Sequence, residues 1–89
     1  MIKKEVLIEN QLGLHARAAA QIVKAACAFS SKITLVKDGL EVDGKSVMGI
    51  MMLAAAKGCT LMLHADGSDE TDAVARLECL FKDKFGEKE

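Results

Sequence analysis

The chain has 89 residues, of which 51% are hydrophobic and 28% are charged, and its formal net charge is -1. The length predicts a single domain spanning residues 1–89, and the composition excludes a disordered or fibrous protein. Three Phe and no Tyr or Trp, together with the balanced charge, argue against a nucleic-acid binder, which needs a basic face or stacking side chains.

The first half of the chain alternates between strand and helix patterns. Lys4 to Glu9 mixes apolar and charged residues in alternation, which predicts a half-buried strand. From Ala16 to about Cys27, apolar residues recur at helical spacing and predict an amphipathic helix. Two further strands are expected over residues 32–37 and 40–43, joined at Asp38-Gly39, a dipeptide typical of tight hairpin turns.

The second half continues this alternation. Ser46 is well placed as the N-cap of a helix from Val47 to about Leu53. A fourth strand follows at residues 60–65, and Ser68 or Asp69 is expected to cap a last helix that reaches about Phe85. The residues expected on the core face of that helix are Ala73, Val74, Leu77, Leu80 and Phe81. The order β-α-β-β-α-β-α predicts an α/β protein of the α+β type. Its one mostly antiparallel sheet carries helices on one face and meets water on the other.

Residues 39–46 match the phosphate-loop pattern of nucleotide hydrolases letter for letter, reading Gly-Leu-Glu-Val-Asp-Gly-Lys-Ser. Such a loop needs consecutive backbone N–H groups that point inward. The residues before Gly44 instead alternate like a strand, whose N–H groups belong to a ladder, and the carboxylate of Asp43 would repel phosphates. The hairpin is therefore the favoured interpretation, and nucleotide hydrolysis is kept as a minor alternative.

The cysteines and the second histidine carry no clear signal of chemistry. Cys27, Cys59 and Cys79 are odd in number and lack the spacing of a disulfide framework or a zinc site. Each is expected to pack as a small apolar side chain. His64 lies within an expected strand and is interpreted as a structural residue on the solvent face. Because these residues and His15 share no ligand-like spacing, a metal role is the weakest alternative, and no bound metal or other cofactor is expected.

Targeting signals are also missing from the sequence. The N-terminal residues run into a strand pattern rather than an apolar signal segment. The longest uncharged apolar run, residues 47–56, is about half as long as a membrane span requires. We therefore expect a soluble cytoplasmic protein with no membrane insertion, and no feature demands more than a monomer.

The first candidate site is Gly13-Leu14-His15-Ala16-Arg17, where a loop turns into the first helix. Free N–H groups at a helix start bind anions, and the guanidinium of Arg17 suits phosphate. The neutral imidazole of His15 is a nucleophile at cellular pH. These features predict a histidine that accepts a phosphoryl group, although a surface histidine beside an unrelated arginine fits the spacing equally well.

The second candidate site is Ser46 with the methionines that follow it. A short helix cannot bury residues on every side, so some of Met48, Met51 and Met52 must face outward as adaptable contacts for partners. A phosphate on Ser46 would add about -1.5 to -2 charges at the helix start and would repel a partner docking on an adjacent apolar patch.

Taken together, the His15 motif before an Ala-rich helix and Lys45-Ser46-Val47-Met48-Gly49 before the second helix identify a resemblance. The sequence resembles the histidine-containing phosphocarrier protein (HPr) family of the bacterial sugar phosphotransferase system. The resemblance extends over essentially the whole chain. It implies an open-faced β-sandwich, with three helices on one face of a four-stranded antiparallel sheet.

The resemblance also implies a reaction and its partners. Enzyme I, which draws on phosphoenolpyruvate and Mg²⁺, would phosphorylate His15 on Nδ1, and the group would pass to an enzyme IIA-type domain. Arg17 would match the active-site arginine of the family. Ser46 would match the serine that an ATP-dependent HPr kinase/phosphorylase modifies in many members. The face expected to bind partners around His15 consists of Ala16, Ala20, Gln21, Lys24, Met48 and Met51.

One residue departs from the family pattern, which usually continues His-Ala-Arg-Pro, whereas this chain has Ala18. Proline in the first helical turn fixes φ and removes an N–H that is unpaired anyway. Ala18 therefore returns one donor near the expected phosphate and leaves the stiffness of the first turn open. The alternative function is a non-transferring regulatory binding module of the same fold, acting in nitrogen or carbon regulation through Ser46 and the methionines.

Overall fold

The structure is a computed structural model that describes residues 1–87. Its strands are β1 (Ile2–Leu7), β2 (Lys32–Lys37), β3 (Leu40–Asp43) and β4 (Thr60–Asp66). Its helices are α1 (Ala16–Ala26), α2 (Val47–Met52) and α3 (Glu70–Lys82), followed by a 3₁₀ turn, η1 (Lys84–Gly86). The predicted order of elements is confirmed, although the first strand begins two residues earlier than Lys4 and ends before Ile8.

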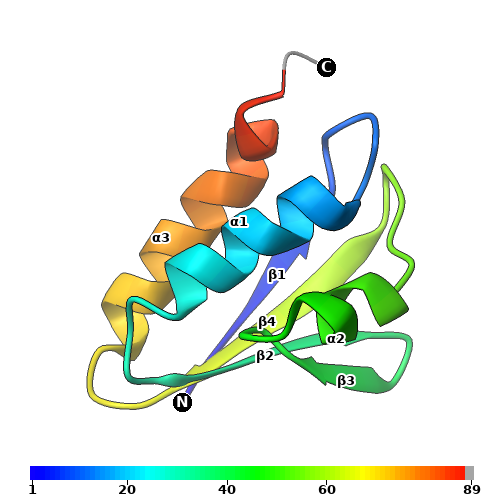
Figure 1. Cartoon of the computed structure of the whole chain (residues 1–89). Coiled ribbons are helices and arrows are strands. Elements are labelled where there is room, and N and C mark those ends of the chain that lie inside the picture. Colours follow the sequence, from blue (N-terminus) through cyan, green and yellow to red (C-terminus); the bar gives the residue numbers. More distant parts are fainter. Residues whose placement is uncertain (88–89) are drawn as a thin grey trace.

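The four strands form one antiparallel sheet in the order β1-β4-β2-β3. The helices cover one face of this sheet, and the other face carries no element (Figure 1). Side chains alternate accordingly, so that Leu61 and Leu63 of β4 are buried whereas Met62 and His64 are only half-buried. The open-faced sandwich is confirmed, and His64 lies on the uncovered face as predicted, paired in register with Lys3 and Thr34.

The hairpin interpretation of residues 39–46 is also confirmed. Asp38 and Gly39 have φ angles of 51° and 83°, the left-handed pair that a two-residue hairpin turn requires. Residues 40–43 pair with β2, and the N–H of Gly44 donates to Ile33 at 2.8 Å. The backbone that a phosphate loop would turn toward a nucleotide therefore belongs to the edge of the sheet.

Helices α1 and α3 pack against each other and α3 packs on β1 and β4, which places the core between the sheet and the helix layer. The residues of α3 predicted to face the core are all buried, namely Ala73, Val74, Leu77, Leu80 and Phe81. From α1, the buried side chains are mainly alanines with Ile22 at 0% exposure. Small side chains let α1 pack closely against its neighbours α2 and α3.

The last helix ends earlier than predicted, at Lys82 instead of Phe85. Lys84 and Phe85 both adopt positive φ angles, 54° and 57°, so the helix is interrupted there by a kink. Beyond the kink, the ring of Phe85 is buried edge-on against Phe81, with ring centroids 5.2 Å apart. Burial of an aromatic ring outweighs the modest cost of two left-handed residues, which periodicity alone does not reveal.

The cap predicted for this helix is wrong in its chemistry. Asp69 occupies the N-cap position, but its side chain makes no hydrogen bond to its own helix. Its carboxylate instead accepts from the N–H groups of Ser30 at 2.8 Å and Ser31 at 3.0 Å, and from the hydroxyl of Ser31. These bonds, led by the Ser31 hydroxyl and the Ser30 N–H, lower the pKa of Asp69 to about 2. Asp69 therefore links the connection between α1 and β2 to the start of α3.

The prediction that all three cysteines pack as apolar side chains is wrong for two of them. Cys27 and Cys79 are exposed, and Cys59 is half-buried against the core. Cys27 follows the last residue of α1, and Cys79 lies two positions from Leu77 and Phe81, which places it on the opposite side of α3. Exposure here follows from helix phase, which overrides the general preference of cysteine for the interior.

Residues 1–87 contain no helix with the length and apolar character needed to cross a bilayer. Within the same residues, no three His, Cys, Asp or Glu side chains are grouped as a metal site would require.

Candidate functional site

The loop before α1 is held by contacts on both sides. Gly13 has a φ of +65°, and a Cβ at this position would lie 2.6 Å from the carbonyl oxygen of Ala55. The next residue, Leu14, donates its N–H to that same oxygen at 2.9 Å. Asn10, which is fully buried, donates its amide to the carbonyl of Gly13 at 2.7 Å. This close approach needs glycine and fixes the backbone that leads into His15.

His15 occupies the N-cap position of α1, with φ -74° and ψ 175°. Its carbonyl accepts the first helical hydrogen bond, from the N–H of Ala19 at 2.9 Å. The N–H groups of Ala16, Arg17 and Ala18 consequently have no acceptor within the helix. The His15 side chain makes no capping bond, so the donors of the first turn are available to an anion. Ala18 is among these donors, as predicted from its replacing a proline.

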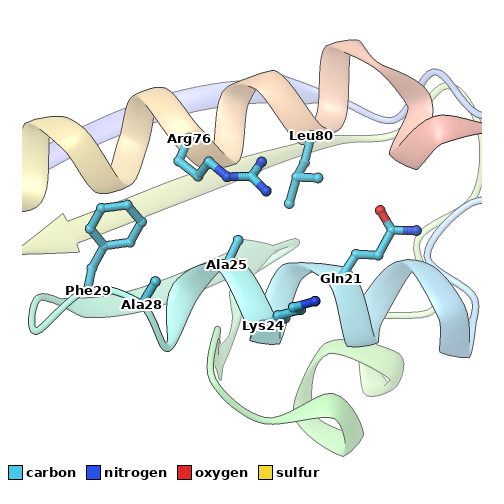
Figure 2. A pocket seen from close by; sticks show the side chains of 7 residues that line it. All are labelled: Gln21, Lys24, Ala25, Ala28, Phe29, Arg76 and Leu80. Carbon is cyan, nitrogen blue, oxygen red and sulfur yellow. The ribbon is translucent and has the colours of Figure 1, made fainter.

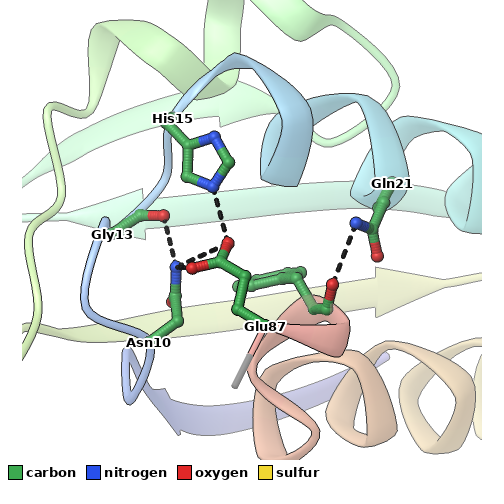
Figure 3. Close-up of polar contacts among 6 residues, drawn as sticks. Asn10, Gly13, His15, Gln21 and Glu87 are labelled. Carbon is green, nitrogen blue, oxygen red and sulfur yellow. Dashed lines mark hydrogen bonds and ion pairs between the residues drawn. The ribbon is translucent and has the colours of Figure 1, made fainter. Parts of the chain in front are cut away.

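A carboxylate that the sequence did not reveal contacts the imidazole. Nε2 of His15 lies 2.6 Å from Oε2 of Glu87, which comes from the other end of the chain (Figure 3). The amide of Asn10 donates to both carboxylate oxygens at 3.3 Å. The hydrogen bond with His15 is the largest cause of a lowered pKa of Glu87, and the Asn10 bond and the charge of Arg17 act in the same direction. Asn10 and Glu87 belong to no motif, and 72 residues separate Glu87 from His15.

Arg17 projects from the first turn of α1 and is exposed. In the part of the chain that the structure describes, it forms no ion pair with a carboxylate. Its guanidinium is therefore available to an incoming anion, which a fork of N–H donors can bind in a bidentate manner.

The second candidate residue, Ser46, is confirmed as the N-cap of α2. Its backbone is extended, and its hydroxyl accepts from the N–H of Gly49 at 3.1 Å. The side chains of Met48, Met51 and Met52 are 78%, 45% and 69% exposed. We call these three residues the methionine patch. Since α1 and α2 pack against each other (Figure 1), the patch lies on the helix layer beside α1.

Most residues predicted to bind partners are exposed, and one has a structural partner as well. Ala16, Ala20 and Lys24 are exposed along α1. Gln21 is half-buried, and its amide donates to the carbonyl of Phe85 at 3.0 Å (Figure 3). Gln21 therefore helps to hold the C-terminal segment in place, and the docking role of this surface stays a prediction.

A surface hollow of about 390 Å³ lies between α1 and α3 (Figure 2). The residues that line it are Gln21, Lys24, Ala25, Ala28, Phe29, Arg76 and Leu80. Neither His15 nor Arg17 lines the hollow, so it is separate from the site at the start of α1.

These features define a small α+β protein in which a half-buried histidine begins a helix with unpaired donors, beside an arginine that forms no ion pair within residues 1–87. The model of the family described as "PTS HPr component phosphorylation site" matches residues 2–83. The phosphocarrier protein HPr of Cupriavidus necator is 45% identical over 89 residues, which cover 100% of both chains. The chain therefore belongs to the HPr family of phosphocarrier proteins of the phosphotransferase system.

Solved structures agree with this assignment. The crystal structure of HPr-C-His from Thermoanaerobacter tengcongensis superposes with a TM-score of 0.96 at 44% identity, covering 100% of both chains. An HPr dimer from the same bacterium has a TM-score of 0.79 at 45% identity and covers 98% of this chain and 100% of that one. Since HPr has been solved as a dimer as well, the monomeric state expected from the sequence stays a prediction.

Proposed function

We propose that this protein accepts a phosphoryl group from enzyme I on Nδ1 of His15 and passes it to an enzyme IIA-type domain. The arrangement of His15 among the unpaired N–H groups of the first turn and the free guanidinium of Arg17 carries the proposal. A phosphorylated imidazole is an anion, and helix N-termini and arginine both stabilise anions. The ring nitrogen that does not meet Glu87 is on the far side of the imidazole (Figure 3). No metal or cofactor on this chain is required, because enzyme I supplies the phosphoryl group from phosphoenolpyruvate with Mg²⁺.

The donor and the acceptor must both reach His15, so they compete for the surface around it. That surface combines the exposed positions of α1, Ala16, Ala20 and Lys24, with Met48 and Met51 of the methionine patch. A carrier has to bind and release each partner quickly. We therefore expect each interface to bury less than about 1,200 Å², in the range of transient complexes.

The test is the intact mass of the protein after incubation with enzyme I from the same organism, Mg²⁺ and phosphoenolpyruvate. The wild type should gain one phosphoryl group that is lost in mild acid, and His15→Ala should gain none while it remains folded. Acceptance by His15→Ala would mean that another residue is the carrier. If the wild type gains nothing, the non-transferring regulatory module becomes the better hypothesis, with Ala18 the first substitution to examine.

We further propose that phosphorylation of Ser46 by an HPr kinase/phosphorylase lowers transfer through His15. Ser46 is the N-cap of α2 and lies two residues before Met48, which is 78% exposed. A phosphate there would place negative charge beside an apolar docking surface, where a partner would have to desolvate it. Ser46→Asp, a partial mimic, should raise the apparent KM for transfer from phosphorylated enzyme I. An unchanged KM would contradict the proposed regulation.

A further inference from the structure

The C-terminal segment continues past the end of α3, at the same end of the molecule as the start of α1 (Figure 1). Three consecutive residues, Lys84, Phe85 and Gly86, have left-handed φ angles of 54°, 57° and 78°. The N–H of Gly86 donates to the carbonyl of Asp83 at 2.9 Å, and that of Glu87 donates to Lys84 at 3.0 Å. Because the ring of Phe85 is also buried, the backbone itself directs Glu87 toward His15.

The carboxylate of Glu87 is shielded by the groups it binds. Its side chain is 16% exposed, against 27% for His15. Both of its oxygens accept from the buried amide of Asn10, and Oε2 lies 2.6 Å from Nε2 of His15. An ionised carboxylate can only accept hydrogen bonds, so Nε2 must carry the hydrogen in this contact. The neutral ring then has its lone pair on Nδ1.

We propose that Glu87 is a positioning residue for phosphoryl transfer, because its carboxylate holds the imidazole of His15 in the Nε2–H tautomer and orients Nδ1 as the nucleophile. This inference rests on the proposed function of His15. It adds a residue outside the segment that the family model matches, residues 2–83. In the Ser-His-Asp triad a buried carboxylate plays the same orienting part toward the histidine that acts as general base.

In the transfer step, the lone pair of Nδ1 attacks the phosphorus of the donor and forms the N–P bond. The bond from phosphorus to the donor breaks, and its electron pair stays on the donor. The ring retains its Nε2 hydrogen and becomes positively charged, and the Glu87 carboxylate stabilises this charge through the same hydrogen bond. When the group moves on, the N–P bond breaks and its electrons return to Nδ1.

Two variants of Glu87 separate the hydrogen bond that holds the tautomer from the stabilisation of the positive charge on the ring. Glu87→Ala removes both the acceptor and the charge, whereas Glu87→Gln keeps an oxygen that can accept from Nε2 but carries no charge. Glu41→Gln serves as the matched control, because it also removes one negative charge and lies exposed on β3. Thermal unfolding of all four proteins verifies that the fold is retained.

The first readout is the tautomer, from long-range ¹H–¹⁵N correlation spectra of the His15 ring at about pH 8.5, above the usual titration range of histidine. The wild type, Glu87→Gln and the control should show a protonated Nε2 and an unprotonated Nδ1. Glu87→Ala should show both tautomers in exchange. A Glu87→Ala spectrum identical to that of the wild type would overturn the inference.

The second readout is the rate of transfer from phosphorylated enzyme I in a rapid-quench experiment. We expect Glu87→Ala to lower kcat roughly tenfold, the loss of one hydrogen bond to a charged group, and to leave KM unchanged. Glu87→Gln should fall between Glu87→Ala and the wild type, and the control should match the wild type. A wild-type kcat in Glu87→Ala would overturn the role proposed for Glu87 but not the proposed function of His15. A wild type that accepts no phosphoryl group would overturn the proposed function itself, and the tautomer readout would still report on the contact.

Discussion

Helices α1 and α2 begin with the same backbone geometry, but the side chains of their N-cap residues are used differently. His15 and Ser46 are both N-cap residues with extended backbones, and both precede a helix on the same face of the sheet. Ser46 binds the N–H of its own helix at Gly49, whereas the side chain of His15 makes no such bond. A side chain that caps its helix contributes to stability, and one that leaves the helix uncapped leaves donors and imidazole for chemistry.

The uncapped start needs support from elsewhere, and the structure provides it. The loop before His15 is tied to Ala55 through Leu14 and to Asn10 through Gly13. The imidazole itself is bound by Glu87 from the C-terminal segment. The start of the six-residue helix α2 is held by Lys45, whose ammonium donates to the carbonyl of Phe29 at 2.9 Å, and is capped by its own Ser46. Three predictions examine this difference.

The largest effect is expected for Gly13→Ala. Its φ of +65° disfavours any Cβ, and the added atom would lie 2.6 Å from the carbonyl oxygen of Ala55. Backbone strain and overpacking together should lower the free energy of unfolding by about 2–4 kcal/mol. Urea titration measures this, with Gly39→Ala as a control, since Gly39 shares a positive φ but meets nothing within 4 Å. Equal losses in both variants would show that strain alone matters and that the loop is not braced at Ala55.

A smaller effect is expected for the caps themselves. Ser46→Ala removes the bond to the Gly49 N–H and should lower the free energy of unfolding by about 1 kcal/mol. His15→Ala removes no cap and should cost less, although on the proposed function it should abolish phosphoryl acceptance. Urea titrations of both variants side by side provide the measurement. A larger loss of stability in His15→Ala than in Ser46→Ala would contradict the difference drawn between the two helix starts.

The smallest effect at neutral pH is expected at the third helix start, where Asp69 binds Ser30 and Ser31 rather than its own helix. The pKa of Asp69 is lowered to about 2, below the value of about 3.9 for an unfolded chain. The carboxylate therefore stabilises the fold above about pH 4, and this contribution disappears as the pH falls toward 2.

Asp69→Asn should accordingly unfold at a lower urea concentration than the wild type at pH 7. The difference between the two unfolding midpoints should become smaller as the pH falls from about 4 to about 2. The matched control is Asp72→Asn, which removes a charge from the same first turn. A gap for Asp69→Asn that is constant over this pH range would contradict the assigned role of the carboxylate.

Local sequence patterns were sufficient to predict most of the fold. Alternation, the Asp38-Gly39 dipeptide and the Ser46 cap are short-range features, and each was confirmed because the energy that favours it comes from neighbouring residues. The core face of α3 follows in the same way from helical spacing. The errors came from packing and hydrogen bonds that periodicity does not encode. The helix α3 ends early because Phe85 packs on Phe81 beyond a kink, and Asp69 binds Ser30 and Ser31 in the α1–β2 connection in preference to its own helix.

For the candidate site, the sequence by itself determined His15, Arg17 and the uncapped start of the first helix, since those lie within one turn of each other. Only the tertiary structure decided that Asn10 and Glu87 complete the site. Glu87 is 72 residues from His15, and no periodicity connects the two. Their contact exists because the chain kinks after α3, where Phe85 is buried, and because α3 packs beside α1. The segment that carries Glu87 therefore reaches His15 only once the core has formed.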